Sequence, residues 1–167
     1  MSPTSPSPTT VDLCQYLQVD DVIDWQSPEV MALAQRIGQA CDTPISIAQA
    51  CFEWVRDEIF HSSAHQMNPV TCCASDVLKH RTGYCFAKSH LLAALLRANQ
   101  IPAGFCYQRQ SVDDSGPPYS LHGFNAIHLP EFGWYRVDAR GNKPGEAAQF
   151  TQPQEQLAYA IRIAEEA

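Results

Sequence analysis

Apolar residues recur every three or four positions through the first half of the chain. Within residues 28–40 they include Val30, Leu33 and Ile37, which fall on one face of a helix. The Ser-Pro pair that opens this segment is typical of a helix N-terminus, with the serine as cap and the proline in the first turn. A second segment of the same period, residues 44–60, follows a Thr-Pro start signal and predicts an amphipathic helix.

The next residues are less regular until a long apolar segment begins. Residues 61–74 are polar and mixed, which predicts a loop, and a short helix is expected over residues 75–80. From Cys85 to Asn99 the chain is dominated by alanine and leucine, so the predicted helix is apolar on most sides. Such a helix is typical of a central, buried position.

The period changes in the second half of the chain. The pattern predicts strands over residues 104–109, 121–129 and 133–137, and a turn-rich loop over residues 113–118 separates the first two. Residues 154–166 have a weak helical pattern. Because the helices come first and the strands follow, the order predicts an α+β fold and not an alternating α/β fold.

Composition limits the domain organisation and the partners. Residues 1–10 are rich in serine, threonine and proline and are predicted to be disordered, which leaves residues 11–167 as one domain. The 11 Lys and Arg residues against 18 Asp and Glu give a net charge of −7, which argues against nucleic acid or an anionic membrane as a partner. No apolar run reaches the roughly 20 residues that span a bilayer. The N-terminus lacks the features of a secretory signal, so a cytoplasmic location is expected.

The chain has seven cysteines, an odd number without a C-x-x-C pair, and most are expected to be small buried hydrophobic residues. Cys85 differs because Gly83 lets the chain turn sharply just before it and a helix begins there. A thiol at a helix N-terminus faces unpaired N–H groups and the positive end of the dipole, which favour the nucleophilic thiolate. Lys88, one turn on, is expected to add positive potential. A nucleophile and a merely structural cysteine both remain open on this local pattern.

A thiolate nucleophile needs a base, and the base needs a group that orients it. His122 lies on one predicted strand and Asp138 ends the next. A three-residue hairpin loop over residues 129–131 places His122 directly opposite Asp138, with both side chains on one face of the sheet. A two-residue turn at residues 131–132 offsets them by three residues, which is too far for a hydrogen bond. The pairing therefore depends on the loop around Pro130.

Three blocks of sequence carry more information in order than any one of them alone. The first is a Gly-Tyr-Cys that ends at Cys85, the helix to Arg97 and an Ile-Pro-Ala just beyond it. The second is His122-Gly-Phe with its strand, and the third is a Gly-Trp followed by Val-Asp, ending at Asp138. These blocks, with the 16-residue step from histidine to aspartate, resemble transglutaminase-like cysteine peptidases. The resemblance covers about residues 45–142.

The resemblance implies a papain-like core, in which a central nucleophile helix packs against an antiparallel sheet. It implies that Cys85 is the nucleophile, that His122 is the general base and then the acid, and that Asp138 orients His122. Gly-Phe follows the histidine where the family often has Ala-Trp, and Ala-Arg follows the aspartate where Pro-Thr is commoner. These departures concern the substrate groove more than the chemistry. The family's upstream oxyanion donor has Gln66 and Asn68 as candidates here.

Other polar residues fit a site less well. His128 shares a strand face with the proposed base but has no aspartate at a suitable offset. His90 lies about 140° round the helix from the proposed nucleophile. A group of histidines and cysteines between residues 61 and 80 lacks a recognised zinc spacing, so a polar loop without metal or cofactor is expected. Its members are His61, His65, Cys72, Cys73 and His80.

The sequence therefore predicts a cysteine hydrolase that cleaves an amide bond of a peptide or small molecule through a thioester. A transglutaminase, which passes the acyl group to an amine instead of water, is an alternative because the same triad serves both reactions. A catalytically silent binding module on the same fold is the alternative from another class. The presence of Cys85, His122 and Asp138 argues against it.

Overall fold

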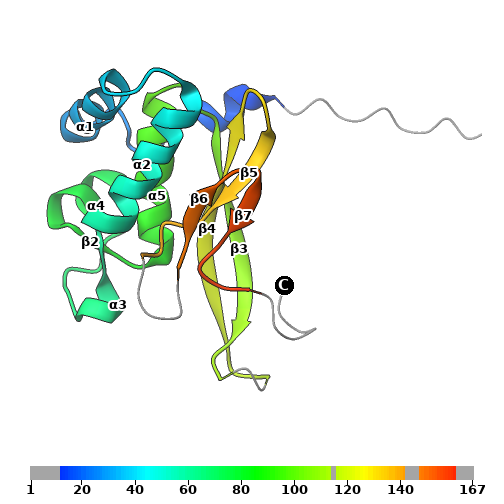
Figure 1. Cartoon of the computed structure of the whole chain (residues 1–167). Helices are drawn as coiled ribbons and strands as arrows, with labels where there is room; N and C mark the ends of the chain where they lie inside the picture. The colour runs from blue at the N-terminus through cyan, green and yellow to red at the C-terminus, as the bar shows by residue number, and fades with distance from the viewer. Residues whose placement is uncertain (1–11, 114–115, 142–146, 161–167) are drawn as a thin grey trace, which may run out of the picture.

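The computed structural model describes residues 12–113, 116–141 and 147–160, so the disorder predicted for residues 1–10 lies outside the described part. The helices come first and the strands follow, which is the predicted α+β order (Figure 1). The elements in chain order are η1 (Leu13–Leu17), α1 (Pro28–Gln39), α2 (Pro44–Glu58), β1 (Phe60–His61), α3 (Ser62–His65), α4 (Ala74–His80), β2 (Thr82–Gly83), α5 (Cys85–Ala98), β3 (Ala103–Ser111), β4 (Tyr119–Leu129), β5 (Gly133–Val137), β6 (Gln149–Thr151) and β7 (Gln154–Gln156).

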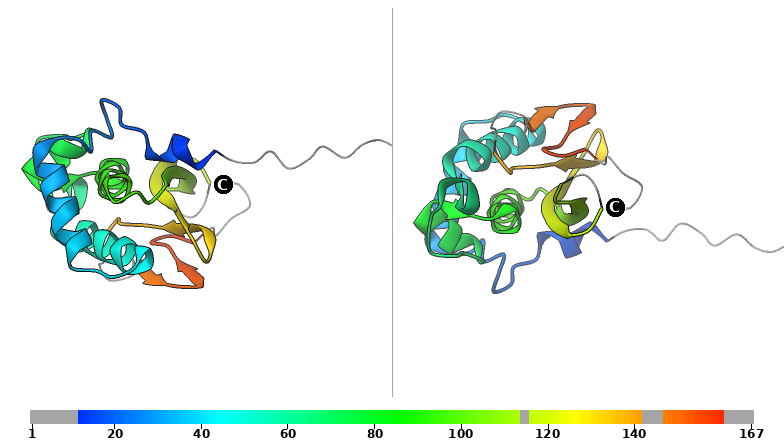
Figure 2. Two further views of the ribbon diagram at one scale, coloured as in Figure 1. Left: turned by 90° about the horizontal axis from the view of Figure 1, so that it is seen from above. Right: turned by 90° about the horizontal axis from the view of Figure 1, so that it is seen from below.

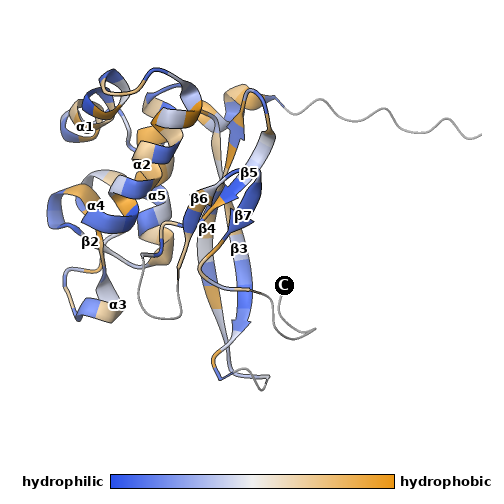
Figure 3. Cartoon of the chain, in the orientation of Figure 1, coloured by the Kyte–Doolittle hydropathy of each residue, from blue (hydrophilic) through white to orange (hydrophobic). Residues whose placement is uncertain are grey.

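Helix α5 is the centre of the fold. It lies between the other helices and the sheet β3-β4-β5 (Figure 2). Every residue from Leu91 to Leu96 is completely buried, which confirms the predicted buried helix. Apolar residues of α1 and α2 pack against it, while polar residues colour their outer sides (Figure 3). No helix in the described part of the chain is long and apolar enough to cross a bilayer.

Local signals decide where the first two helices begin. Helix α1 begins directly after Ser27, although the Ser27 side chain makes no capping hydrogen bond. Helix α2 begins after Thr43, whose hydroxyl accepts a hydrogen bond from the N–H of Ser46 in a reciprocal capping box. Helix α2 ends at Glu58, two residues before the predicted end, because the chain there turns into strand β1.

The predicted loop over residues 61–74 contains regular structure, so that prediction is wrong in part. Strand β1 pairs in parallel with β2, which places Phe60 beside Thr82 and His61 beside Gly83. Helix α3 follows β1 directly. Parallel pairing joins residues that are far apart in the chain, so no local pattern between residues 61 and 74 indicates it.

The main sheet is antiparallel, with β4 between β3 and β5. Leu129 pairs with Gly133, so the hairpin loop comprises residues 130–132. The predicted loop over residues 129–131 is therefore wrong, and the register differs from the predicted one by two residues. Gly133 has a φ of 70°, a conformation that favours glycine and that closes three-residue hairpin loops.

The segment after residue 147 is extended. Strands β6 and β7 form a hairpin, and Glu155 of β7 binds Arg136 of β5 through an ion pair of 2.7 Å and a hydrogen bond from the Arg136 N–H of 2.9 Å. The helix predicted over residues 154–166 is therefore wrong up to residue 160, and its remainder lies outside the described residues. The contacts between β7 and β5 therefore decide the conformation of this segment, although its sequence has a weak helical pattern.

Candidate active site

Cys85 is the first residue of helix α5 and is half-buried. Gly83, two residues earlier, is needed for close packing: a Cβ atom there would lie 3.0 Å from the Cβ of Ala87. Gly83 is not among the residues with positive φ, so its role is to admit the first turn of α5 and not to supply the predicted sharp turn. The close approach of Gly83 to Ala87 holds the residues before the helix against its first turn.

The thiol group lies where the β4–β5 pairing ends. The last pair is Asn125 with Val137, and the next-but-one N–H along β4, that of Gly123, donates a hydrogen bond of 3.4 Å to Cys85 Sγ. Burial raises the pKa of the Cys85 thiol, but a hydrogen bond with His122 and the backbone N–H groups of Gly123 and Phe86 outweigh it and hold the pKa below its ordinary value. The site therefore favours the thiolate.

His122 and Asp138 form a buried pair. His122 Nε2 lies 2.7 Å from Asp138 Oδ2, and the two side chains are 4% and 1% exposed. Continued one step past its last pair, the β4–β5 register places Asp138 opposite Phe124, so His122 and Asp138 are diagonal neighbours on one face of the sheet. The predicted direct opposition is wrong, but the shift of two residues keeps both side chains on the same face.

His122 joins the thiol to the carboxylate. Burial lowers the pKa of His122, but hydrogen bonds with Asp138 and Cys85, and the charges of both, raise it to about 9. Since Nε2 faces Asp138, Nδ1 is the ring nitrogen left for Cys85. A thiol with a lowered pKa beside an imidazole with a raised pKa favours a thiolate–imidazolium pair near neutral pH.

The C-terminal segment completes the surroundings of the pair, and the sequence prediction missed it. The N–H of Ala158 donates to Asp138 Oδ2 at 3.0 Å, and the N–H of Arg140 donates to Oδ1 at 3.0 Å. The Tyr159 ring lies edge-on to His122 with 4.9 Å between centroids. No local signal marks these residues, because their role depends on where the chain returns after β7.

Two buried polar side chains tie the nucleophile helix to the sheet. The Ser89 hydroxyl lies 2.9 Å from the carbonyl oxygen of Cys85 and 3.1 Å from that of Gly123. The Asn125 amide donates to the carbonyl oxygens of Ser89 at 3.1 Å and Gly104 at 3.2 Å. These positioning residues hold α5 and β4 in register at the thiol. In the sequence, Asn125 is marked as a polar residue within the apolar part of its strand, whereas Ser89 lies between Lys88 and His90 and carries no such signal.

Lys88 has a different role from the predicted one. It is 1% exposed, and its Nζ donates to the carbonyl oxygens of Arg56 at 3.1 Å and Ile59 at 2.5 Å. These carbonyls belong to the end of α2, so Lys88 caps that helix from within the core. Burial lowers the pKa of Lys88 to about 7, so it is not the fixed positive charge expected beside Cys85.

The other predicted candidates lie apart from the thiol. His128 contacts the ring of Trp134 at 5.4 Å, six residues along β4 from His122. His90 lies 2.7 Å through Nδ1 from the carbonyl oxygen of Cys72. Gln66 and Asn68 are exposed, and no hydrogen bond joins either to Cys85 among the described residues. The position of an oxyanion side-chain donor remains a prediction.

The remaining cysteines differ from expectation in their burial. All seven are free, but only Cys51 is fully buried, and Cys14 and Cys72 are exposed. Their expected role as buried hydrophobic residues is therefore wrong for most of them. Within the described residues, no three His, Cys, Asp or Glu side chains gather as a metal-binding group.

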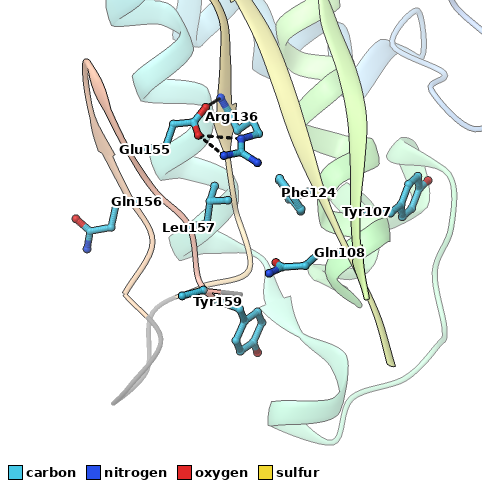
Figure 4. A pocket seen from close by; sticks show the side chains of 9 residues that line it. Tyr107, Gln108, Phe124, Arg136, Glu155, Gln156, Leu157 and Tyr159 are labelled. Atoms are coloured by element: carbon cyan, nitrogen blue, oxygen red, sulfur yellow. Dashed lines mark hydrogen bonds and ion pairs between the residues drawn. The ribbon is translucent and has the colours of Figure 1, made fainter. Parts of the chain in front are cut away.

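A cavity of about 470 Å³ lies between the sheet and the segment that includes β7 (Figure 4). Phe124 and Tyr159, which both contact the His122 ring, form part of its wall. The Arg136–Glu155 ion pair lies at the opposite end. The His122 side chain is only 4% exposed, and its ring packs against these two aromatic rings.

Comparison with known proteins places this chain in a family. The model of the transglutaminase-like superfamily matches residues 31–139, and the chain therefore belongs to that superfamily, with the predicted papain-like core. The structure is similar to a "putative cysteine protease" from Cytophaga hutchinsonii, with 20% identity, a TM-score of 0.61 and coverage of 77% of this chain and 42% of that one. It is also similar to the periplasmic domain of TgpA from Pseudomonas aeruginosa, with 25% identity, a TM-score of 0.59 and coverage of 78% and 48%. This chain thus spans less than half of either structure. No match was found among curated proteins.

Proposed function

We propose that the protein is a cysteine-dependent amide hydrolase that acts through Cys85, His122 and Asp138. The observation that carries the proposal is the continuous hydrogen-bonded chain from the thiol through the imidazole to the carboxylate, with 2.7 Å between His122 Nε2 and Asp138 Oδ2. The order of these three groups is that of a nucleophile, a base and a group that orients the base. The substrate is a peptide or a small amide.

The first half of the reaction forms a thioester. Cys85 Sγ attacks the amide carbonyl carbon, and the unpaired N–H groups at the start of α5 are suited to hold the oxyanion. The C–N bond then breaks, and His122 gives its proton to the departing amine. Asp138 keeps the imidazole oriented and supports its positive charge before that transfer.

The second half releases the acyl group. His122 takes a proton from water, the hydroxide oxygen attacks the thioester carbon, and the C–S bond breaks to give a carboxylic acid and the thiolate. If an amine took the place of water, the product would be a new amide and the reaction a transglutaminase-type transfer. Product analysis with water and a primary amine in competition separates the two, and the proposal predicts the acid as the main product.

The activation of Cys85 is testable without a known substrate. The rate of Cys85 alkylation by iodoacetamide, followed at that residue by mass spectrometry, is measured against pH for wild type, His122→Ala and His128→Ala. We expect a reactive thiolate below pH 8.5 in wild type and in His128→Ala, and an ordinary thiol with a pKa near 8.5 in His122→Ala. An ordinary thiol in wild type, insensitive to His122, would instead support a silent binding module.

A further inference from the structure

The β3–β4 hairpin carries large apolar side chains beyond the start of α5. In Figure 1 the two strands extend beyond the N-terminal end of α5, so one face of the hairpin has no helix over it. Tyr107, Tyr119 and Leu121 are 55%, 36% and 65% exposed. Apolar side chains that are exposed together, unlike single scattered ones, are a feature of binding surfaces.

The strand register puts these side chains on one face. Tyr107 pairs with Gly123, Arg109 with Leu121, and Ser111 with Tyr119, and directly paired residues point to the same side. The opposite face carries Gln108, and Tyr107 and Gln108 point to opposite sides of the strand (Figure 4). Arg109 lies on the same face, with its guanidinium 5.0 Å from the centre of the Tyr119 ring. We call the apolar members of this face, Tyr107, Tyr119 and Leu121, together with Phe86, the apolar strip.

The apolar strip begins at the nucleophile. A Cβ on Gly123 would lie 3.3 Å from Cα of Phe86 and 3.5 Å from Cε1 of Tyr107, so both residues border Gly123. The N–H of the same glycine donates to Cys85 Sγ. Leu121 is two residues further along β4, or about 7 Å at the rise of a strand. A substrate residue spans about 3.5 Å when extended. The 7 Å from Gly123 to Leu121 therefore equals the length of about two extended substrate residues, counted from the scissile carbonyl.

Resting on the proposed function, we infer that the apolar strip binds an aromatic or branched aliphatic side chain next to the scissile amide. Tyr107 also lines the cavity, so the strip and the cavity meet at this residue. The strip, and not the rest of the cavity, takes this role because Phe86 and Tyr107 border Gly123, whose N–H donates to Cys85 Sγ. The substrate class is therefore amides with an apolar group within two residues of the bond that breaks.

A pair of neutral alkylating agents tests the strip. Iodoacetamide and its N-phenyl form, iodoacetanilide, react in the same way: Sγ bonds to the methylene carbon and iodide leaves. The ratio of their rate constants at Cys85, divided by the same ratio for glutathione, isolates the contribution of the phenyl group. We expect a corrected ratio of about 10 in wild type, from burial of part of the ring.

Variants locate the effect. Leu121→Ser is expected to reduce the corrected ratio several-fold, because it removes an apolar side chain of the strip. Phe132→Ser removes another exposed apolar side chain, 46% exposed against 65% for Leu121, in the loop between β4 and β5, and should leave the ratio unchanged. A ratio near 1 in wild type overturns the inference, and so does a loss that occurs in Leu157→Ser, which alters the cavity, but not in Leu121→Ser.

Two further outcomes are distinguishable. An iodoacetamide rate that does not depend on His122 defeats the proposed function, while the corrected ratio still reports on the strip.

The exposed strip is also able to bury itself against a second copy of the chain. Sedimentation of wild type and Leu121→Ser decides this: a dimer that the substitution dissociates overturns the substrate role, and a monomer in both supports it.

Discussion

Asp138→Asn is the substitution that examines the site most directly, because it keeps the shape of the side chain and removes its charge. The two carboxylate oxygens of Asp138 accept three N–H donors, from His122, Arg140 and Ala158. An asparagine presents one oxygen and one NH₂ group. At least one of the three donors therefore loses its acceptor, and the His122 imidazolium loses its buried counter-charge.

The size of the effect follows from the two coupled pKa values. Without the carboxylate, the pKa of His122 falls from about 9 toward its ordinary 6.5. The imidazolium is then depleted at neutral pH, and the pKa of the Cys85 thiol rises toward its ordinary value. A thiol with a pKa near 8.5 is only about 1% ionised at pH 6.5, so alkylation there falls by up to ~100-fold.

The assay is the iodoacetamide pH profile at Cys85, measured from about pH 5 to 10. We expect wild type and Asp138→Asn to differ most at low pH and to converge above about pH 9, where an ordinary thiol is also ionised. Thermal unfolding of both proteins at the same pH values identifies any loss of folded protein. Coincident profiles for two folded proteins would refute a role for Asp138 in setting the charge of the pair.

Three further predictions concern the residues that hold the site. Because burial lowers the pKa of Lys88 from 10.5 to about 7, the unfolded chain binds the Lys88 proton more tightly between these values. Lys88 therefore contributes a rise of stability with pH of up to ~1.4 kcal/mol per unit, while His122, whose pKa is raised to about 9, contributes a fall. Urea unfolding at several pH values should show a smaller rise in Lys88→Met than in wild type, and equal slopes would contradict the shift. Gly123→Ala brings a Cβ to 3.3 Å from Phe86 Cα, so Cys85 alkylation near pH 7 should slow without loss of helix by circular dichroism; an unchanged rate would show that the approach of β4 to α5 is not critical. Asn125→Ala removes two buried hydrogen bonds and should cost ~2–3 kcal/mol in chemical denaturation, whereas a neutral result would mean that solvent or neighbouring groups replace them.

The parts of the fold that the sequence predicted well are those with local causes. Helices α1 and α2 begin where a hydroxyl residue precedes a proline, and α5 begins at Cys85 as expected. Each depends on residues within one or two turns of one another. The β1–β2 pair and the C-terminal hairpin were missed because their partners are distant in the chain or, for β7, because contacts with β5 decide the conformation.

The candidate site divides in the same way. The order of cysteine, histidine and aspartate, and the helix that begins at the cysteine, are properties of the sequence. Whether His122 reaches Asp138 depended on the hairpin register, which the structure shifts by two residues relative to the prediction. The contact survives because an even shift keeps a side chain on the same face of a sheet, while an odd shift would have moved it to the other face.

By itself, the sequence determined a buried helix with Cys85 at its start, followed by strands that carry His122 and Asp138. Only the tertiary structure decided that these two side chains meet diagonally, that the chain returns after β7 to place Ala158 and Tyr159 against them, and that Lys88 caps α2 instead of facing the thiol. The physical reason is range: periodicity and capping act within a few residues. The surroundings of a buried charge instead depend on segments that are distant along the chain and adjacent in space.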